Sequence, residues 1–232
     1  MSPINQKIAA IQQQILDAES RFSRQFNSVQ LLAVSKTRTA NEIRLALQAG
    51  LSAFGESYLQ EALEKIDQLQ HENIEWHFIG RIQSNKTKLI AEHFDWVHSI
   101  DNLKHAKRLN SQRPDELPPL KVCLQVNVSQ EESKGGFIPE LMPSVIAEFE
   151  MLPRLELSGL MTIPAPAGSF DEQRLPFQRL SQLRDQLADE RWPLETLSMG
   201  MSVDMEAAIA EGATIVRVGT AIFGARSYSE LP

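Results

Sequence analysis

Short apolar runs alternate with longer amphipathic segments along most of this chain, beginning at Val29. This alternation is typical of βα units, in which parallel strands are joined by helices that cover the sheet. It limits the chain to a few α/β architectures. The runs predict eight strands, over Val29 to Ser35, Leu51 to Gly55, Ile74 to Gly80, Trp96 to Ile100, Val122 to Val128, Leu155 to Ile163, Leu194 to Ser198, and Thr214 to Gly219.

Helix signals lie between these runs. Thr39 and Glu42 have the spacing of a capping box before a helix over Ala40 to Leu47. Gly212 follows a predicted helix over Met205 to Ala210, at the position where a left-handed residue commonly ends a helix. Eight strands with eight crossovers predict a (β/α)8 TIM barrel, a fold that commonly fills about 200 to 250 residues. Periodicity alone leaves an open doubly wound sheet as the alternative.

The first residues predict an extra N-terminal helix. Ser2 and Pro3 suit a helix start, and four isoleucines recur at helical spacing after them. Polar residues interrupt this segment, so we expect no signal peptide. The sequence has no apolar stretch of about 18 residues, so we expect no transmembrane helix. The proline-rich segments lie beside strands, which predicts a single domain over residues 1–232. The isoleucines are Ile4, Ile8, Ile11 and Ile15.

Charge and cysteine content narrow the class of partner and the compartment. The formal net charge is −7 and the sequence pI is about 5.3, so no binding to nucleic acid or to a membrane surface is expected. The basic stretch Lys104 to Arg108, with Arg113 after it, is interpreted as a solvated helix face. The single cysteine, Cys123, lies in an apolar run and cannot form an intrachain disulfide. A reducing compartment, the cytoplasm, is therefore expected.

A lysine closes the first predicted strand. The carboxyl ends of barrel strands form the mouth where active sites are built, so Lys36 would stand at that mouth. Burial lowers the pKa of an amine, and the neutral amine can attack an aldehyde. A lone lysine at a strand end is more often simply solvated. Its position makes Lys36 a candidate and no more than that.

Small residues follow the last two predicted strands, whose loops are the usual phosphate site of a barrel. Ser198 to Ser202 leads into a helix, and its hydroxyls and backbone amides could hold a phosphate dianion. Gly219 allows backbone to approach a ligand, and Thr220 adds a hydroxyl donor. Each segment alone could be an ordinary turn. Their joint position predicts a phosphate site.

Arg217 shares one face of the last predicted strand with Ile215 and Gly219. Its guanidinium points either into the barrel mouth or into the helix layer, and both surroundings are mostly apolar. The guanidinium therefore needs a fixed acceptor, which a ligand ring nitrogen or phosphate would provide. An internal ion pair with Asp204 or Glu56 is the equal alternative.

Two further clusters end the second and third predicted strands and are expected to line the mouth. They are Phe54 to Tyr58, and Trp76 to Gly80 with Gln83, Asn85 and Lys86 beyond. His77 in the second cluster is interpreted as a hydrogen-bonded strand histidine. The five histidines show no metal-ligand spacing, so no metal site is expected.

Six motifs occur in order along the chain: L-L-A-V-S-K-T, F-G-E-x-Y-x-Q-E, W-H-F-I-G-x-x-Q-x-N-K, G-L-M-x-I, S-M-G-M-S-x-D-M-x-x-A-I and V-R-x-G-T-A-I-F-G. In these motifs and their spacing the chain resembles the pyridoxal phosphate homeostasis protein family (YggS/PROSC type). The resemblance covers essentially the whole length. It implies a single (β/α)8 TIM barrel like the N-terminal domain of alanine racemase, PLP fold type III, with pyridoxal 5′-phosphate (PLP) bound as an internal imine.

The resemblance also implies roles for individual residues. Lys36 would form the imine, and Arg217 would face the pyridine nitrogen. The family usually has Asn where this chain has Ser57, so any contact between that amide and the cofactor is in doubt here. The phosphate would be held by Ser202, Gly219 and Thr220, further cofactor-binding residues would be Ser57, Met201 and His77, and Asn127, Glu131 and Lys134 also match the family pattern.

The function that the resemblance implies is intracellular PLP homeostasis. The protein would be a monomeric carrier or regulator that affects amino-acid and keto-acid balance, with PLP and PLP-dependent apo-enzymes as partners. Alanine racemase uses a second domain and a tyrosine from it, whereas this chain has only Tyr58 and Tyr228 and about a dozen residues after Thr220. No enzymatic turnover is therefore expected. The alternatives are a small PLP-dependent amino-acid racemase or lyase, and a Schiff-base aldolase that acts on a phosphorylated sugar without a cofactor.

Overall fold

A computed structural model describes residues 3–129 and 135–225 of the chain. Its parallel strands form a closed barrel in which each strand pairs with the next and β8 pairs with β1. This confirms the predicted (β/α)8 TIM barrel and excludes the open sheet. The strands are β1 (Gln30–Val34), β2 (Ala53–Glu56), β3 (Glu75–Phe78), β4 (Trp96–Ile100), β5 (Leu120–Gln125), β6 (Leu155–Met161), β7 (Thr196–Ser198) and β8 (Ile215–Val218).

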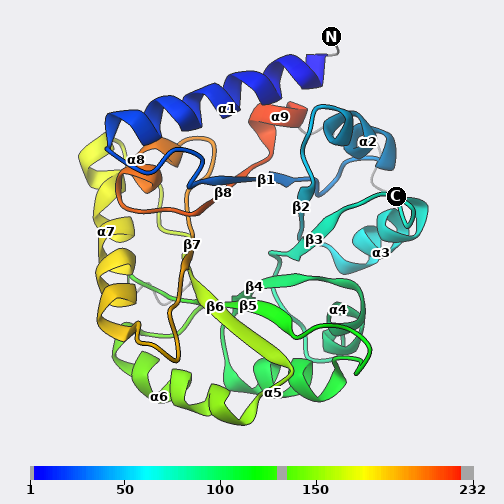
Figure 1. The fold of residues 1–232 in the computed structure, drawn as a ribbon, viewed down its shortest axis with the longest axis vertical. Helices are drawn as coiled ribbons and strands as arrows, with labels where there is room; N and C mark the ends of the chain where they lie inside the picture. The colour runs from blue at the N-terminus through cyan, green and yellow to red at the C-terminus, as the bar shows by residue number, and fades with distance from the viewer. Residues whose placement is uncertain (1–2, 130–134, 226–232) are drawn as a thin grey trace.

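Helices surround the barrel, as Figure 1 shows. The predicted capping box of Thr39 and Glu42 is present at the start of α2, and Gly212 has the left-handed φ of +100° expected after α8. The helices are α1 (Pro3–Arg21), α2 (Ala40–Gln48), α3 (Leu59–Gln68), α4 (Thr87–His93), α5 (Leu103–Gln112), α6 (Met142–Glu148), α7 (Phe170–Leu187), α8 (Met205–Ala210) and α9 (Thr220–Phe223), with short 3-10 turns at Pro139–Leu141 and Phe149–Met151.

The additional helix α1 packs across α2, α8 and α9, where the barrel closes (Figure 1). Its isoleucine stripe faces inward, because Ile8, Ile11 and Ile15 are all buried. The amphipathic spacing predicted from the sequence therefore places α1 over the junction of the first and last strands. Within the described ranges, no helix is both long and apolar enough to cross a bilayer.

Alternation along the strands divides the buried side chains into two layers. Residues such as Val216 and Val218 face the helices and belong to the large apolar cluster between sheet and helices. The opposite faces fill the barrel interior. That interior holds two small apolar groups among the described residues, one of Leu32, Ala53 and Ile215, the other of Trp96, Cys123 and Met161.

Several strand ends differ from the predicted ones. β5 begins two residues earlier than predicted and ends at Gln125, because Val126 makes only an isolated bridge with Phe137. β7 begins at Thr196 rather than at Leu194, whose φ of +45° is incompatible with a regular strand. These ends depend on pairing partners that apolar runs do not specify.

The prediction that the basic stretch from Lys104 to Arg113 is a solvated helix face is wrong at two positions. Lys104 and Lys107 are exposed, but His105 and Arg113 are buried. The guanidinium of Arg113 donates hydrogen bonds to the carbonyl oxygens of Ala91, Phe94 and Pro118. Arg113 thus satisfies carbonyl groups at the end of α4, a structural role that a count of basic residues does not indicate.

Candidate functional site

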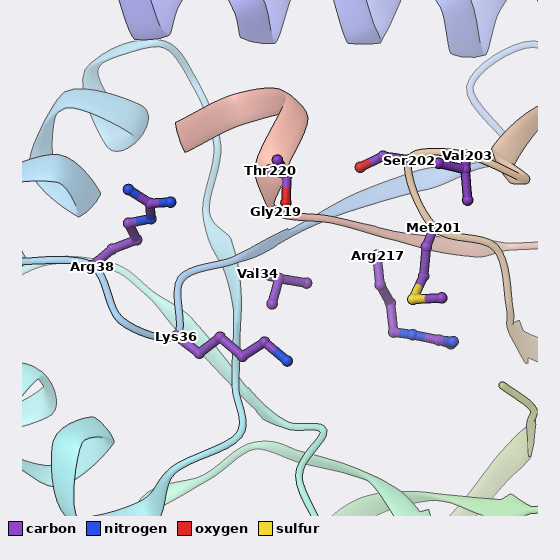
Figure 2. A pocket seen from close by; sticks show the side chains of 9 residues that line it. All are labelled: Val34, Lys36, Arg38, Met201, Ser202, Val203, Arg217, Gly219 and Thr220. Atoms are coloured by element: carbon purple, nitrogen blue, oxygen red, sulfur yellow. The ribbon is translucent and has the colours of Figure 1, made fainter. Parts of the chain in front are cut away.

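A cavity of about 230 Å³ lies at the carboxyl ends of β1, β7 and β8, beside the seam where the barrel closes. A larger hollow of about 530 Å³ lies around Trp96 and Trp192, at the amino ends of the strands. Barrel active sites lie at the carboxyl ends, so we assign the candidate site to the smaller cavity. Figure 2 shows its lining residues: Val34, Lys36, Arg38, Met201, Ser202, Val203, Arg217, Gly219 and Thr220.

The turn that carries Lys36 is held in place by side chains of α3. Lys36 follows the end of β1 and is half-buried, and the next residue, Thr37, has a left-handed φ of +64°. The Nζ of Lys65 on α3 donates to the carbonyl oxygen of Ser35 at 2.7 Å, and the amide of Thr37 donates to Glu61 Oε1 at 2.5 Å. The backbone on both sides of Lys36 is therefore held by side chains of α3.

Lys65 also forms a buried ion pair. Its Nζ lies 2.8 Å from Glu56 Oε1 and contacts Glu61, and Ser35 Oγ donates to the same Glu56 oxygen at 2.6 Å. Burial raises the pKa of Glu56, although Lys65 and Ser35 oppose this shift. No described group donates a hydrogen bond to Glu56 Oε2. We call Ser35, Glu56, Glu61 and Lys65 the Lys65 cluster.

Arg38 joins the loops after β1 and β8. Its Nη2 donates to the carbonyl oxygen of Gly224 at 2.6 Å, and its Nη1 lies 3.5 Å from Glu42. The guanidinium also lies over the ring of Phe223, 5.8 Å from its centroid. These contacts fix the loop of Lys36 relative to the loop of Thr220.

The loop after β7 is held in place by its own aspartate and by β8. Gly200 has a φ of +92°, and a Cβ there would lie 2.5 Å from the Cβ of Ala208, so glycine is required. The amide of Met201 donates to Asp204 Oδ1 at 2.6 Å, and the amide of Arg217 donates to Gly200 O at 3.0 Å. The loop thereby presents Met201 and Ser202, both exposed, over the cavity.

The loop after β8 forms the opposite wall. A Cβ at Gly219 would lie 3.1 Å from the carbonyl oxygen of Val34, so this glycine allows β8 and β1 to approach closely at the cavity. Thr220 is exposed and begins α9. Figure 2 shows Ser202 and Thr220 on facing loops, with the Ser202 hydroxyl directed toward Thr220. The two predicted phosphate loops therefore meet at one place.

Arg217 extends into the barrel interior and is only 4% exposed. Its Nη1 donates to Ser198 Oγ at 2.8 Å and its Nη2 to the carbonyl oxygen of Thr162 at 2.9 Å. Burial lowers the pKa of Arg217 to about 10, so it is charged at neutral pH. The alternative ion pair with Asp204 or Glu56 is wrong, because within the described ranges neither carboxylate forms a salt bridge with Arg217.

Two of the predicted cofactor-binding residues do not line the cavity. His77 lies within β3, fully buried, and its ring contacts His98 and Glu75, as expected of a hydrogen-bonded strand histidine. Ser57 is half-buried and packs against Gly80, where a Cβ would lie 2.1 Å from the Ser57 carbonyl oxygen. The other expected mouth residues, Gln83, Asn85, Lys86 and Asn127, also lie outside this lining, and Glu131 and Lys134 lie outside the described residues.

Sequence reasoning missed residues that shape or support the cavity. Alternation along β1 places Val34 and Lys36 on one face, so Val34 could have been found from the pattern. No local pattern marks Lys65, which has the spacing of a surface pair with Glu61. The remaining missed residues are Arg38, Val203, Thr162 and Ser198 in its role as acceptor for Arg217.

The cavity combines three chemical groups that suit one kind of ligand. The amine of Lys36 extends into it beside Arg217, while the hydroxyls of Ser202 and Thr220 lie at another side (Figure 2). An amine can bond an aldehyde, a guanidinium can donate to a ring nitrogen or an anion, and hydroxyls beside backbone amides can bind phosphate. The lining therefore fits a small phosphorylated aldehyde with a ring acceptor.

Comparisons with known proteins agree with this description. Residues 7–227 match the family model described as alanine racemase, N-terminal domain. A pyridoxal phosphate homeostasis protein of Pseudomonas aeruginosa is 55% identical over 228 residues, which are 98% of each chain. The structure of PipY from Synechococcus elongatus with PLP bound superposes with a TM-score of 0.81 at 34% identity, over 95% of this chain and 100% of that one. Alanine racemase of Corynebacterium glutamicum shares the fold, with a TM-score of 0.64 at 19% identity over 94% of this chain and 63% of that one.

Proposed function

The chain belongs to the family of pyridoxal phosphate homeostasis proteins, and we propose that it binds PLP covalently through Lys36 and acts as a PLP carrier or regulator, not as an enzyme. The observation that carries this proposal is the meeting of Lys36, Arg217 and the two hydroxyl loops in one cavity. We further propose that the barrel is one domain that works as a cytoplasmic monomer and passes PLP to apo-enzymes.

Each part of the lining takes one part of the ligand. The neutral amine of Lys36 attacks the aldehyde carbon of PLP, a C=N bond replaces the C=O bond, and the aldehyde oxygen leaves as water. Ser202 and Thr220 donate hydroxyl hydrogen bonds to the phosphate, and Gly219 keeps backbone close to it. Met201 lines the cavity from the loop after β7.

Arg217 is assigned to the ring nitrogen of PLP. An arginine there holds the nitrogen unprotonated, because a charged guanidinium donates a hydrogen bond and supplies no proton. An unprotonated ring is a weak electron sink for carbanions. The site therefore favours binding of the cofactor over chemistry on an amino acid.

The lining offers few groups for proton transfer. Racemases of this fold place bases on both faces of the substrate, whereas no tyrosine or carboxylate is among the described residues that line this cavity. Tyr58 lies elsewhere and is 52% exposed, and Tyr228 lies outside the described residues. Lys36 is the one candidate base in the described lining, which supports a protein without turnover.

Borohydride reduction tests the covalent assignment. Reduction of the PLP-loaded protein should fix the cofactor on the peptide that contains Lys36, as read by mass spectrometry. The Lys36→Ala variant should lose this label and the visible absorbance, while Lys86→Ala, a lysine outside the cavity, should keep both. A label on Lys86 or Lys134 in the wild type would refute the assignment. A colourless protein that reduction joins to a phosphorylated sugar would indicate the aldolase alternative.

Exchange of the substrate α-proton tests the proposal that the protein has no turnover. We expect the α-proton of L- and D-alanine in heavy water to exchange at the rate seen with free PLP, measured by proton NMR. Exchange well above that rate, abolished in Lys36→Ala, would assign the protein to the racemase-like alternative.

A further inference from the structure

A continuous chain of polar side chains crosses the barrel interior and ends at Arg217. It begins with Glu75 at the start of β3 and passes through His77, His98 on β4 and Ser198 on β7. The successive contacts are 3.2 Å from Glu75 Oε2 to His77 Nε2, 2.9 Å from His77 Nδ1 to His98 Nε2, and 2.7 Å from His98 Nδ1 to Ser198 Oγ. Arg217 Nη1 then lies 2.8 Å from Ser198 Oγ. We call these five residues the interior chain.

The interior chain is inaccessible between its two ends, Glu75 and Arg217. His77, His98 and Ser198 are 0% exposed, whereas the side chain of Glu75 is 34% exposed at the amino ends of the strands. His77 is also stacked on Trp96, with 5.5 Å between ring centroids. Two histidines in a barrel interior that is otherwise largely apolar need a reason, because buried polar groups are costly unless all are satisfied.

The chemistry of the two ends fixes the direction of every hydrogen bond. Arginine only donates, so Ser198 Oγ accepts from Arg217 and its own hydroxyl hydrogen goes to His98 Nδ1. His98 then donates from Nε2 to His77 Nδ1, and His77 donates from Nε2 to the Glu75 carboxylate. Each neutral imidazole donates once and accepts once.

The opposite direction is chemically inconsistent. It would turn a lone pair of His77 Nε2 toward a carboxylate oxygen at 3.2 Å. It would also leave the Ser198 hydroxyl hydrogen without an acceptor among the described groups. Protonating either ring is disfavoured because burial lowers the pKa of His77 and of His98. The hydrogen bond from His77 lowers the pKa of Glu75 to about 2, so the carboxylate is charged.

We propose that Glu75, His77, His98 and Ser198 are positioning residues that hold Arg217 in place through a one-way hydrogen-bond chain and keep its remaining donors directed to the ligand in the cavity. This inference rests on the proposed function only for the identity of the ligand. The Glu75 carboxylate lies at the far end of three neutral links, and among the described residues no carboxylate is hydrogen-bonded to Arg217 directly. Arg217 therefore keeps its full charge and its other N–H groups for the ring nitrogen of PLP.

The ring tautomers test the chain without any cofactor. In the apo-protein, ¹⁵N NMR of the histidine rings at pH 7 should show His77 and His98 both neutral and both protonated on Nε2. A proton on Nδ1 of His98, or a charged ring at either position, would overturn the proposed direction. This measurement stays decisive if the protein proves not to bind PLP, so the two proposals fail separately.

Substitutions at His98 test the positioning of Arg217. His98→Leu cannot accept from Ser198 and should weaken the binding of both PLP and pyridoxal by about tenfold. His98→Gln can accept through its amide oxygen and donate through its amide nitrogen, so it should restore most of the affinity. Met161→Leu, an interior substitution of similar volume outside the chain, is the matched control.

Three results would contradict the positioning role of His98. Wild-type affinity in His98→Leu, or equal loss in folded His98→Leu and His98→Gln, would reduce the interior chain to a purely structural element. Loss for PLP but not for pyridoxal would place the effect at the phosphate and also contradict the proposal. Should His98→Leu fail to fold, Ser198→Ala provides a second measurement, because it removes the acceptor of Arg217 Nη1 while Glu75 still fixes the proton on His77 Nε2. Binding of PLP and of pyridoxal should weaken alike in this variant, and wild-type affinity for both would overturn the positioning role.

Discussion

The Lys65 cluster and the interior chain each connect a buried cation to a carboxylate, but over different distances. In the Lys65 cluster, ammonium and carboxylate are in direct contact at 2.8 Å. In the interior chain, Arg217 and Glu75 are separated by Ser198, His98 and His77. A direct pair uses up the donors of its cation on the protein, whereas a separated pair leaves donors for a ligand.

The difference indicates what each cation does. Lys65 donates to Ser35 O, Glu56 and Glu61, so it stabilises the turn that carries Lys36. Arg217 uses two nitrogens on the protein and lines the cavity with the rest of its side chain. Burial alone does not distinguish these roles, because Lys65 and Arg217 are each 4% exposed.

Breaking the direct pair should have the largest effect. Lys65→Met leaves the Glu56 carboxylate buried without its cation, which should lower the free energy of unfolding by about 3 to 5 kcal/mol in denaturant titrations. Lys88→Met removes an exposed partner of Glu92 and should change stability by less than about 1 kcal/mol.

The double variant Glu56→Gln with Lys65→Met sharpens the same test. Removing both charges should recover most of the loss, because a buried pair repays little beyond its own desolvation. If the double variant were as unstable as Lys65→Met, the loss would come from the contact of Lys65 with Ser35 and not from an unbalanced charge.

The phosphate side of the cavity differs from both networks, because Ser202 and Thr220, which carry its hydroxyls, are exposed. Ser202→Ala and Thr220→Val should each weaken PLP binding by about ten- to a hundredfold, since hydrogen bonds to a charged acceptor contribute roughly 1.5 to 3 kcal/mol. Binding of pyridoxal, which lacks the phosphate, should be unchanged in calorimetry. Equal weakening of both ligands would indicate general damage and not loss of a phosphate contact.

The two networks should respond to pH with opposite signs. Burial lowers the folded-state pKa of His98 well below 6.5, so below pH 6.5 the unfolded chain takes up a proton that the folded chain does not, and stability falls. His98→Gln should remove a slope that approaches about 1.4 kcal/mol per pH unit. Burial raises the pKa of Glu56, so its contribution instead declines as pH rises above its unfolded value.

Unfolding titrations at pH 7, 6 and 5 measure this slope. An unchanged pH dependence in His98→Gln would mean that His98 already carries a proton in the folded protein. The interior chain would then have lost its direction.

The smallest effect is expected at Cys123, which shares the barrel interior with the chain. Burial raises the pKa of its thiol to about 12, so iodoacetamide at pH 8 should not label the folded protein. Unfolding should restore ordinary reactivity. Labelling of the native protein would show that the interior admits solvent, which would weaken the argument that its histidines stay neutral.

Much of the barrel could be predicted from the sequence because each strand is a local apolar run. The hydroxyl loops and Arg217 could also be placed, since strand ends in a barrel share one mouth. The side-chain hydrogen bonds that link different strands across the interior could not be predicted. The register shifts between β4 and β5 and between β5 and β6, so strand alternation does not tell which side chain meets His98 across the interior. The burial of Lys65 likewise depends on a turn far from it in sequence.

The cavity straddles the pairing of β1 with β8. During synthesis on the ribosome, the strand that leads to Lys36 leaves early, whereas Arg217 and Thr220 follow only after almost all of the barrel has been made. On the proposed assignment, an unfinished chain carries the Lys36 amine without the groups that would hold the ligand around it. Capture of PLP would thus be reserved for completed molecules, and a ligand bound between the first and last strands would resist the reopening of the barrel at that junction.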